Sequence, residues 1–204
     1  EQGRPVQEMK TFNFFVVELE KPINDTIKTE SGLELFIETK FENSEFDYRV
    51  TEGPVVAAPF KYDTGVEIGD TLYFHHLVVM QGGQVLTGFD NHYIVNYSDQ
   101  FAVQNQAIAY KSQKSGHIHT LFGWALLEPV EQENEVSSDT IEIVSLKEKL
   151  PTKARVAFDS QELHDIGAKK GDIVGFKENR DYRITIDGKE YYRTRVEDLL
   201  YAEA

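Results

Sequence analysis

The chain has 204 residues, a formal net charge of −14, 40% hydrophobic residues and no cysteine. An acidic surface repels phosphate, so the charge disfavours both nucleic acid and anionic membranes as partners. The absence of cysteine excludes a disulfide scaffold, cysteine-ligated zinc and thiol catalysis. No apolar run reaches the ~20 residues that span a bilayer. We therefore expect a soluble, cytoplasmic protein.

From the amino terminus, residues 1–10 are polar and are expected to form a flexible tail. Short β-branched and aromatic runs follow, separated by Gly, Asp, Asn and Pro, a pattern typical of an all-β sandwich or barrel. Asp187-Gly188 predicts a hairpin turn, because glycine accepts the positive φ of such turns. Gln81-Gly82-Gly83-Gln84 predicts a second one. Examples of the runs expected as strands are Phe14–Leu19, Val55–Ala58, Thr71–Phe74, Tyr93–Tyr97, Trp124–Leu127, Ile173–Phe176 and Tyr182–Ile186.

The two halves of the chain repeat the same features in the same order. Two related β-domains follow from this repeat, since its period is close to one small domain. We expect domain 1 at residues 11–111, a linker at residues 112–117 and domain 2 at residues 118–204. The matching pairs are Gly65–Phe74 with Gly167–Phe176, Leu33–Leu35 with Ile141–Ile143, Leu19 with Leu127, and His92–Val95 with Glu190–Arg193.

Each half also contains a long polar stretch, at about residues 24–52 and 131–153. Such stretches exceed the usual β-connection of about 4–6 residues and are expected to be mobile, functional loops. The stretch in the first half encloses the apolar residues 33–37, called the first apolar segment. The stretch in the second half encloses the apolar residues 141–144, called the second apolar segment. One such segment is typical of an edge strand packed on its own domain. Two at matching places in a repeat favour a shared, exposed role.

The carboxy-terminal half resembles the GroES co-chaperonin family over most of its length, and the amino-terminal half resembles it more weakly. The family shows a Val-Gly-Asp-x-Val-x-Phe stretch, then a Gly-Glu-Glu-Tyr stretch and an ending of the Glu-Asp-Ile-Leu-Ala type, in this order. Here the connections that would form the family's roof hairpin are short, which is similar to phage-encoded or bacterial members. The matching residues are Trp124–Pro129, Ala154–Phe158, Lys169–Phe176, Ile186–Tyr192 and Val196–Ala204, with Gly53–Pro59 and Ile68–Phe74 in the first half.

This resemblance implies two tandem irregular β-barrel domains, each holding out a mobile loop that grips a GroEL-type chaperonin. It also implies a homo-oligomeric ring, with a heptamer as the simplest match to a sevenfold partner, in the cytoplasm of a bacterial host cell. The chain would help enclose an unfolded client protein and bind no cofactor itself, since the chaperonin uses the ATP. The residues at the chaperonin-binding positions are Leu33, Glu34, Leu35, Phe36 and Ile37, and Ile141, Glu142, Ile143 and Val144.

Catalytic and metal sites have little support in the sequence, and we expect the chain not to be an enzyme. His117 and His119 could share one face of a strand, but no further ligand completes a metal set. His75 and His76 would point to opposite faces of an extended strand. Trp124 begins an expected core strand and is interpreted as packing. The alternative function is a ligand- or carbohydrate-binding β-sandwich, such as a virion component.

Limited proteolysis separates these two functions. A cap with mobile loops should be cut first within residues 24–52 and 131–153, because exposed polar loops are the preferred sites of nicking. A ligand-binding sandwich with ordered loops should leave both stretches intact. Mass spectrometry of the earliest fragments gives the cleavage positions.

Overall fold

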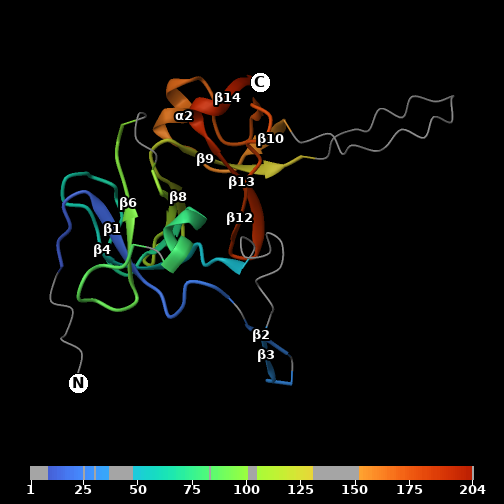
Figure 1. The fold of residues 1–204 in the computed structure, drawn as a ribbon. Coiled ribbons are helices and arrows are strands. Elements are labelled where there is room, and N and C mark those ends of the chain that lie inside the picture. Colours follow the sequence, from blue (N-terminus) through green and yellow to red (C-terminus); the bar gives the residue numbers. More distant parts are fainter. Residues whose placement is uncertain are drawn as a thin grey trace. The chain divides into compact units, whose positions relative to one another are not determined.

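The computed structural model describes residues 9–24, 26–29, 31–36, 48–82, 84–100, 105–130 and 152–203. The chain divides into two compact units, Glu1–Phe122 (unit 1) and Gly123–Ala204 (unit 2). The fold is mostly β, with one six-stranded antiparallel sheet in each unit (Figure 1). The expected tail falls largely outside the described residues, as does nearly all of the second polar stretch.

Unit 1 contains one six-stranded sheet and a separate two-stranded hairpin. The sheet order is β6-β1-β4-β5-β7-β8, so β6 and β8 form its edges. A 3₁₀ helix, η1 (His76–Gly82), follows β5 in the chain. The strands of the sheet are β1 (Phe14–Glu18), β4 (Glu52–Ala57), β5 (Thr71–Phe74), β6 (His92–Asn96), β7 (Ala107–Lys111) and β8 (Ile118–Thr120); those of the hairpin are β2 (Thr26–Lys28) and β3 (Glu34–Phe36).

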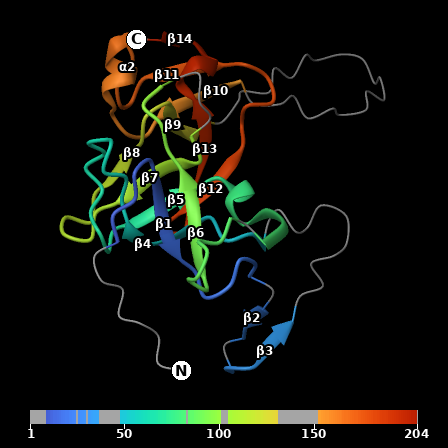
Figure 2. The same ribbon diagram turned by 60° about the vertical axis from the view of Figure 1, so that its left-hand side comes forward.

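Unit 2 contains the second sheet, in the order β12-β13-β9-β10-β11-β14 (Figure 2). Asp187 and Gly188 have φ values of 50° and 75° and join β12 to β13, which confirms the predicted hairpin turn. The short helix α2 (Gln161–Asp165) is capped by the Ser160 side chain, and η2 (Val196–Asp198) precedes the last strand. The strands are β9 (Trp124–Pro129), β10 (Lys153–Val156), β11 (Ile173–Phe176), β12 (Arg183–Ile186), β13 (Lys189–Arg195) and β14 (Leu199–Glu203).

The two sheets share a five-strand arrangement. The order β6-β1-β4-β5-β7 in unit 1 matches β13-β9-β10-β11-β14 in unit 2. Both sheets also have a register irregularity at the same aromatic residue, between Tyr73 and Phe74 in one and between Gly175 and Phe176 in the other. The sequence repeat is therefore a repeat of strand order as well as of residues.

A Gly-Asp turn closes the same pair of strands in each unit. Gly69 and Gly171 adopt φ values of 93° and 95°, a backbone conformation that glycine accepts without steric cost. In unit 1 the Val55 amide donates to the Asp70 carbonyl at 2.9 Å, and the Gly69 amide donates to the Val55 carbonyl at 2.9 Å. Unit 2 makes the same two bonds at 2.9 Å, with Val156 as the central residue.

The hydrogen bonds of the turn place Val55 and Val156 at equivalent positions and so fix the correspondence of the neighbouring strands. Val17 lies opposite Val55, whereas Leu127 lies opposite Val156. Val17 is therefore the counterpart of Leu127, and the sequence match of Leu19 with Leu127 was wrong by two residues. The match rested on the dipeptides Leu19-Glu20 and Leu127-Glu128, which do not occupy equivalent positions in the two sheets.

Each unit has its own hydrophobic core, built from the inward positions of these strands. In unit 1, Phe15, Leu72 and Phe74 are fully buried. In unit 2 the same is true of Leu127 and Leu163, with Phe176 nearly so. The two clusters consist of buried residues from their own unit alone, so each sheet carries its own apolar packing.

Two connections differ from the sequence expectation. Residues 112–117, expected as the linker, instead form the hairpin loop between β7 and β8, where Lys111 lies opposite Ile118. The loop is held by the Gln113 amide, which donates to the Asp70 carboxylate at 2.9 Å. Of the hairpin turn expected at Gln81–Gln84, Gln81 and Gly82 instead form the end of η1, and Gly83 lies outside the described residues.

The turn aspartates provide a matched stability test. The buried Asp70 carboxylate accepts the Glu67 amide at 2.8 Å and the Gln113 amide at 2.9 Å, whereas Asp172 accepts the Lys169 amide at 3.0 Å from a partly exposed position. Removing an acceptor from buried donors costs about 1–3 kcal/mol. Asp70→Ala should therefore lower the free energy of unfolding by about 2–3 kcal/mol and Asp172→Ala by about 1 kcal/mol. Urea unfolding followed by circular dichroism measures both, and equal losses would contradict this assignment.

Candidate functional site

The first apolar segment lies in the β2–β3 hairpin, which forms a sheet of its own. Thr26 lies opposite Phe36 and Lys28 lies opposite Glu34. Thr29 organises the turn: its amide donates to the Leu33 carbonyl at 2.9 Å, and its hydroxyl accepts the Leu33 amide at 3.1 Å. Gly32 completes the turn with a φ of 81° and open space around it.

The apolar side chains of this hairpin are exposed. Leu33 is 59% exposed, Leu35 is 48% exposed and Phe36 is 82% exposed. This exposure argues against the edge-strand alternative, in which the segment would pack on its own domain. An isolated two-stranded hairpin is marginally stable in water, so a surface that buries these side chains would stabilise the hairpin as well as the complex.

The other residues predicted at chaperonin-binding positions are described in part or not at all. Glu34 lies in β3, between Leu33 and Leu35. Ile37 lies outside the described residues, and so does the whole second apolar segment, which is Ile141, Glu142, Ile143 and Val144. Among the described residues, the candidate contact surface therefore consists of the β2–β3 hairpin.

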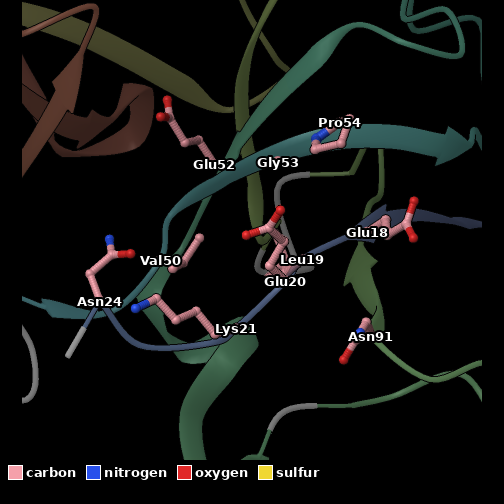
Figure 3. A pocket seen from close by; sticks show the side chains of 10 residues that line it. All are labelled: Glu18, Leu19, Glu20, Lys21, Asn24, Val50, Glu52, Gly53, Pro54 and Asn91. Atoms are coloured by element: carbon pink, nitrogen blue, oxygen red, sulfur yellow. The ribbon is translucent and has the colours of Figure 1, made fainter. Parts of the chain in front are cut away.

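A pocket of about 530 Å³ lies at the base of the hairpin in unit 1 (Figure 3). Lys21 belongs to its wall, and the Lys21 amine donates to the Thr26 hydroxyl at 2.9 Å, which ties the pocket to the first residue of β2. The lining residues combine three glutamates, one lysine and two asparagines with apolar side chains, and they include no Ser, Thr, Cys or His. They are Glu18, Leu19, Glu20, Lys21, Asn24, Val50, Glu52, Gly53, Pro54 and Asn91.

The histidines do not form a metal site in the described part of the chain, where no group of three or more potential ligands comes together. His119 stacks on Tyr110 with ring centroids 5.0 Å apart. The expectation that His75 and His76 diverge is wrong: their ring centroids are 4.3 Å apart. The strand β5 ends at Phe74, so the pair is not extended and the alternation of a strand does not apply.

Trp124 is a packing residue, as predicted, and is 4% exposed. Two arginines stack on it, with the Arg195 guanidinium 4.2 Å and the Arg193 guanidinium 5.9 Å from its ring centroid. Arg193 also lies 5.2 Å from the Tyr182 ring. Burial lowers the pKa of Arg193 to about 10, so the side chain remains charged at neutral pH. Sequence reasoning missed this stack, since the arginines alternate along β13 without a recognisable motif.

No protein-family model matches the chain, and no curated protein matches it in sequence. Among the described residues, no helix is long and apolar enough to cross a membrane. The exposed hairpin and the repeated units are therefore the observations from which a function can be argued.

Exposure of the hairpin leucines predicts that they contribute little to folding. Leu33→Asp combined with Leu35→Asp should change the free energy of unfolding by no more than about 0.5 kcal/mol per substitution, since the side chains are already largely in water. The control Leu72→Asp places a charge at a fully buried position and should cost several kcal/mol. Thermal melts of both variants test this, and unfolding of the hairpin variant would show that the leucines are core residues.

Proposed function

We propose that the chain is a GroES-type co-chaperonin, which caps a GroEL-type chaperonin ring and assists ATP-dependent protein folding. The observation that carries the proposal is the exposure of Leu33 and Leu35 on a hairpin outside the six-stranded sheets. The matching strand order of the two units supports a tandem arrangement, in which each unit closes as an irregular β-barrel. The second apolar segment would serve as the matching contact of unit 2.

The energetics of such a contact favour a multivalent cap. Burying an aliphatic side chain contributes about 1.5–3 kcal/mol, while ordering the loop costs about 1–2 kcal/mol per residue fixed. One hairpin therefore binds weakly. A ring that presents several hairpins at once gains about 10²–10⁴-fold in avidity without any new contact. Weak single contacts also allow the cap to leave at each ATPase cycle of its partner.

The proposal needs no catalytic group or cofactor in this chain. The chaperonin supplies the ATP hydrolysis, and the chain supplies apolar contacts and part of an acidic wall. A net charge of −14 would repel an acidic client from that wall. We place this activity in the cytoplasm of a bacterial host, with a homo-oligomeric ring, heptameric in the simplest case, as the active form.

Binding to a GroEL-type chaperonin tests the function directly. The wild-type chain should co-migrate with the chaperonin in the presence of ATP, and the same run without ATP tests whether binding depends on the nucleotide. The double variant Leu33→Asp with Leu35→Asp should lose at least tenfold in affinity. The matched control is Ile68→Asp with Leu77→Asp, which changes two exposed apolar residues of unit 1 outside the hairpin and should bind as the wild type does.

The same experiment compares the two apolar segments. Ile141→Asp with Ile143→Asp should also weaken ATP-dependent binding, and we expect the larger loss here because unit 2 resembles the family more closely. A wild-type chain that fails to bind the chaperonin under any nucleotide condition would refute the proposed function. Binding that survives both double variants would show that the apolar segments are not the contact.

A further inference from the structure

The pocket of unit 1 lies where the chain leads from the sheet into the β2–β3 hairpin and back again (Figure 3). Two hydrogen bonds join the incoming and outgoing segments at this point. The Asn24 amide donates to the Tyr48 carbonyl at 2.7 Å, and the Val50 amide donates to the Pro22 carbonyl at 2.9 Å. Asn24 and Val50 both line the pocket. A protein that binds the hairpin therefore has this pocket beside its contact.

The charged groups at the rim of the pocket are mainly hydrogen-bond acceptors. Glu18, Glu20 and Glu52 contribute three exposed carboxylates. Lys21 is the only basic side chain among the described lining residues, and its amine already donates to the Thr26 hydroxyl at 2.9 Å. An ionised carboxylate only accepts hydrogen bonds. The complementary ligand is therefore a donor with a positive charge.

The floor of the pocket is apolar. Leu19 is buried, and its Cδ2 atom lies 2.5 Å from the place that a β-carbon on Gly53 would occupy. Glycine at position 53 therefore lets Leu19 lie directly against the backbone of β4. Val50 and Pro54 extend this apolar surface. The side chains of lysine and arginine carry an aliphatic stem below the charged group, and such stems cover apolar surface well.

A buried histidine adds an unsatisfied acceptor beside the carboxylates. His92 lies directly opposite Glu18 in the pairing of β6 with β1. The Leu19 amide donates to the Asn91 carbonyl, so Glu18 and His92 form a non-hydrogen-bonded pair, in which side chains approach most closely. The His92 Nδ1 atom donates to the Asp90 carbonyl at 2.8 Å, so the neutral ring carries its lone pair on Nε2. His92 is 7% exposed, and Nε2 has no hydrogen-bond partner among the described residues.

We infer that this pocket binds a basic side chain, lysine or arginine, of the protein that the hairpin contacts. The charged group would lie against the carboxylates of Glu18 and Glu20, and its stem would cover Leu19. The inference rests on the proposed function and gives the same partner a second, polar contact. Apolar side chains fit many apolar grooves, whereas a buried or half-buried charge excludes partners that lack the opposite charge. The pocket would therefore select among partners that the hairpin alone accepts.

Titration of the isolated chain with single-residue probes tests the pocket without a chaperonin. The basic probes are the Nα-acetyl, N-methylamide derivatives of lysine and arginine. The same derivative of norleucine offers the stem without the charge, and Mg²⁺ offers the charge without the stem. In NMR spectra a basic probe should shift the amide resonances of Leu19, Val50 and Asn91, and the norleucine compound and Mg²⁺ should not. Raising NaCl from about 50 to about 300 mM should weaken the basic probe several-fold, since salt screens exposed charges.

Glutamine variants test the role of the carboxylates. Glu18→Gln with Glu20→Gln keeps the shape of both side chains and removes their charge, and it should weaken the basic probe by about fivefold or more. The matched control, Glu178→Gln with Glu197→Gln, removes two exposed carboxylates of unit 2 and changes the net charge equally. It should bind the probe as the wild type does. All four glutamates are exposed, so both variants should melt at the wild-type temperature.

Binding to the chaperonin then tests whether pocket and hairpin share one partner, and Glu18→Gln with Glu20→Gln should weaken it less than Leu33→Asp with Leu35→Asp does. The inference is overturned if neither basic probe shifts the three resonances, or if Mg²⁺ or the norleucine compound shifts them equally. Full affinity of the glutamine variant for the probe or for the chaperonin would overturn it as well. A chain that binds the basic probes but no chaperonin would refute the proposed function and leave the pocket as a site for basic side chains, so the two failures are distinguishable.

Discussion

The Gly-Asp turn is the constraint on which both units depend. A glycine with positive φ lets the chain reverse while a single valine both donates to and accepts from the turn. The aspartate then ties down the backbone amide three residues earlier. This arrangement fixes where β5 and β11 begin, and through them the register of β7 and β14. A shift of one residue here would move every inward side chain to the wrong face.

Both units contain this turn, but the surroundings of the turn aspartate differ between them. In unit 1 the turn aspartate is buried and also holds the loop between β7 and β8 through Gln113. In unit 2 the equivalent loop partner is absent from the described residues, and Asp172 is partly exposed. The strands that pair with β5 and β11 differ in the same way. In β7 the alanines and Ile108 are buried, whereas in β14 Leu200 and Tyr201 are exposed.

The β-branched and aromatic runs separated by turn residues predicted seven of the strands, which are β1, β4, β5, β6, β9, β11 and β12. The strand β7 was missed because its alanines have weak β-propensity, and β8 because three residues give no periodicity. The polar residues 112–117 suit a hairpin loop as well as a linker, and the sequence does not distinguish them. The exposure of Leu33 and Leu35 could not be predicted from the sequence either. Apolar and polar residues alternate in the same way in an exposed hairpin and in a packed edge strand.

Covalent joining of two similar but unequal units has a consequence for symmetry. Every assembly of this chain contains as many copies of unit 1 as of unit 2, so a closed ring always holds an even number of units. In the proposed function, a sevenfold chaperonin would then be matched chain by chain but never unit by unit. Each chaperonin subunit would contact one copy of unit 1 and one copy of unit 2. The two apolar segments could then diverge in evolution, one toward tighter binding and the other toward faster release.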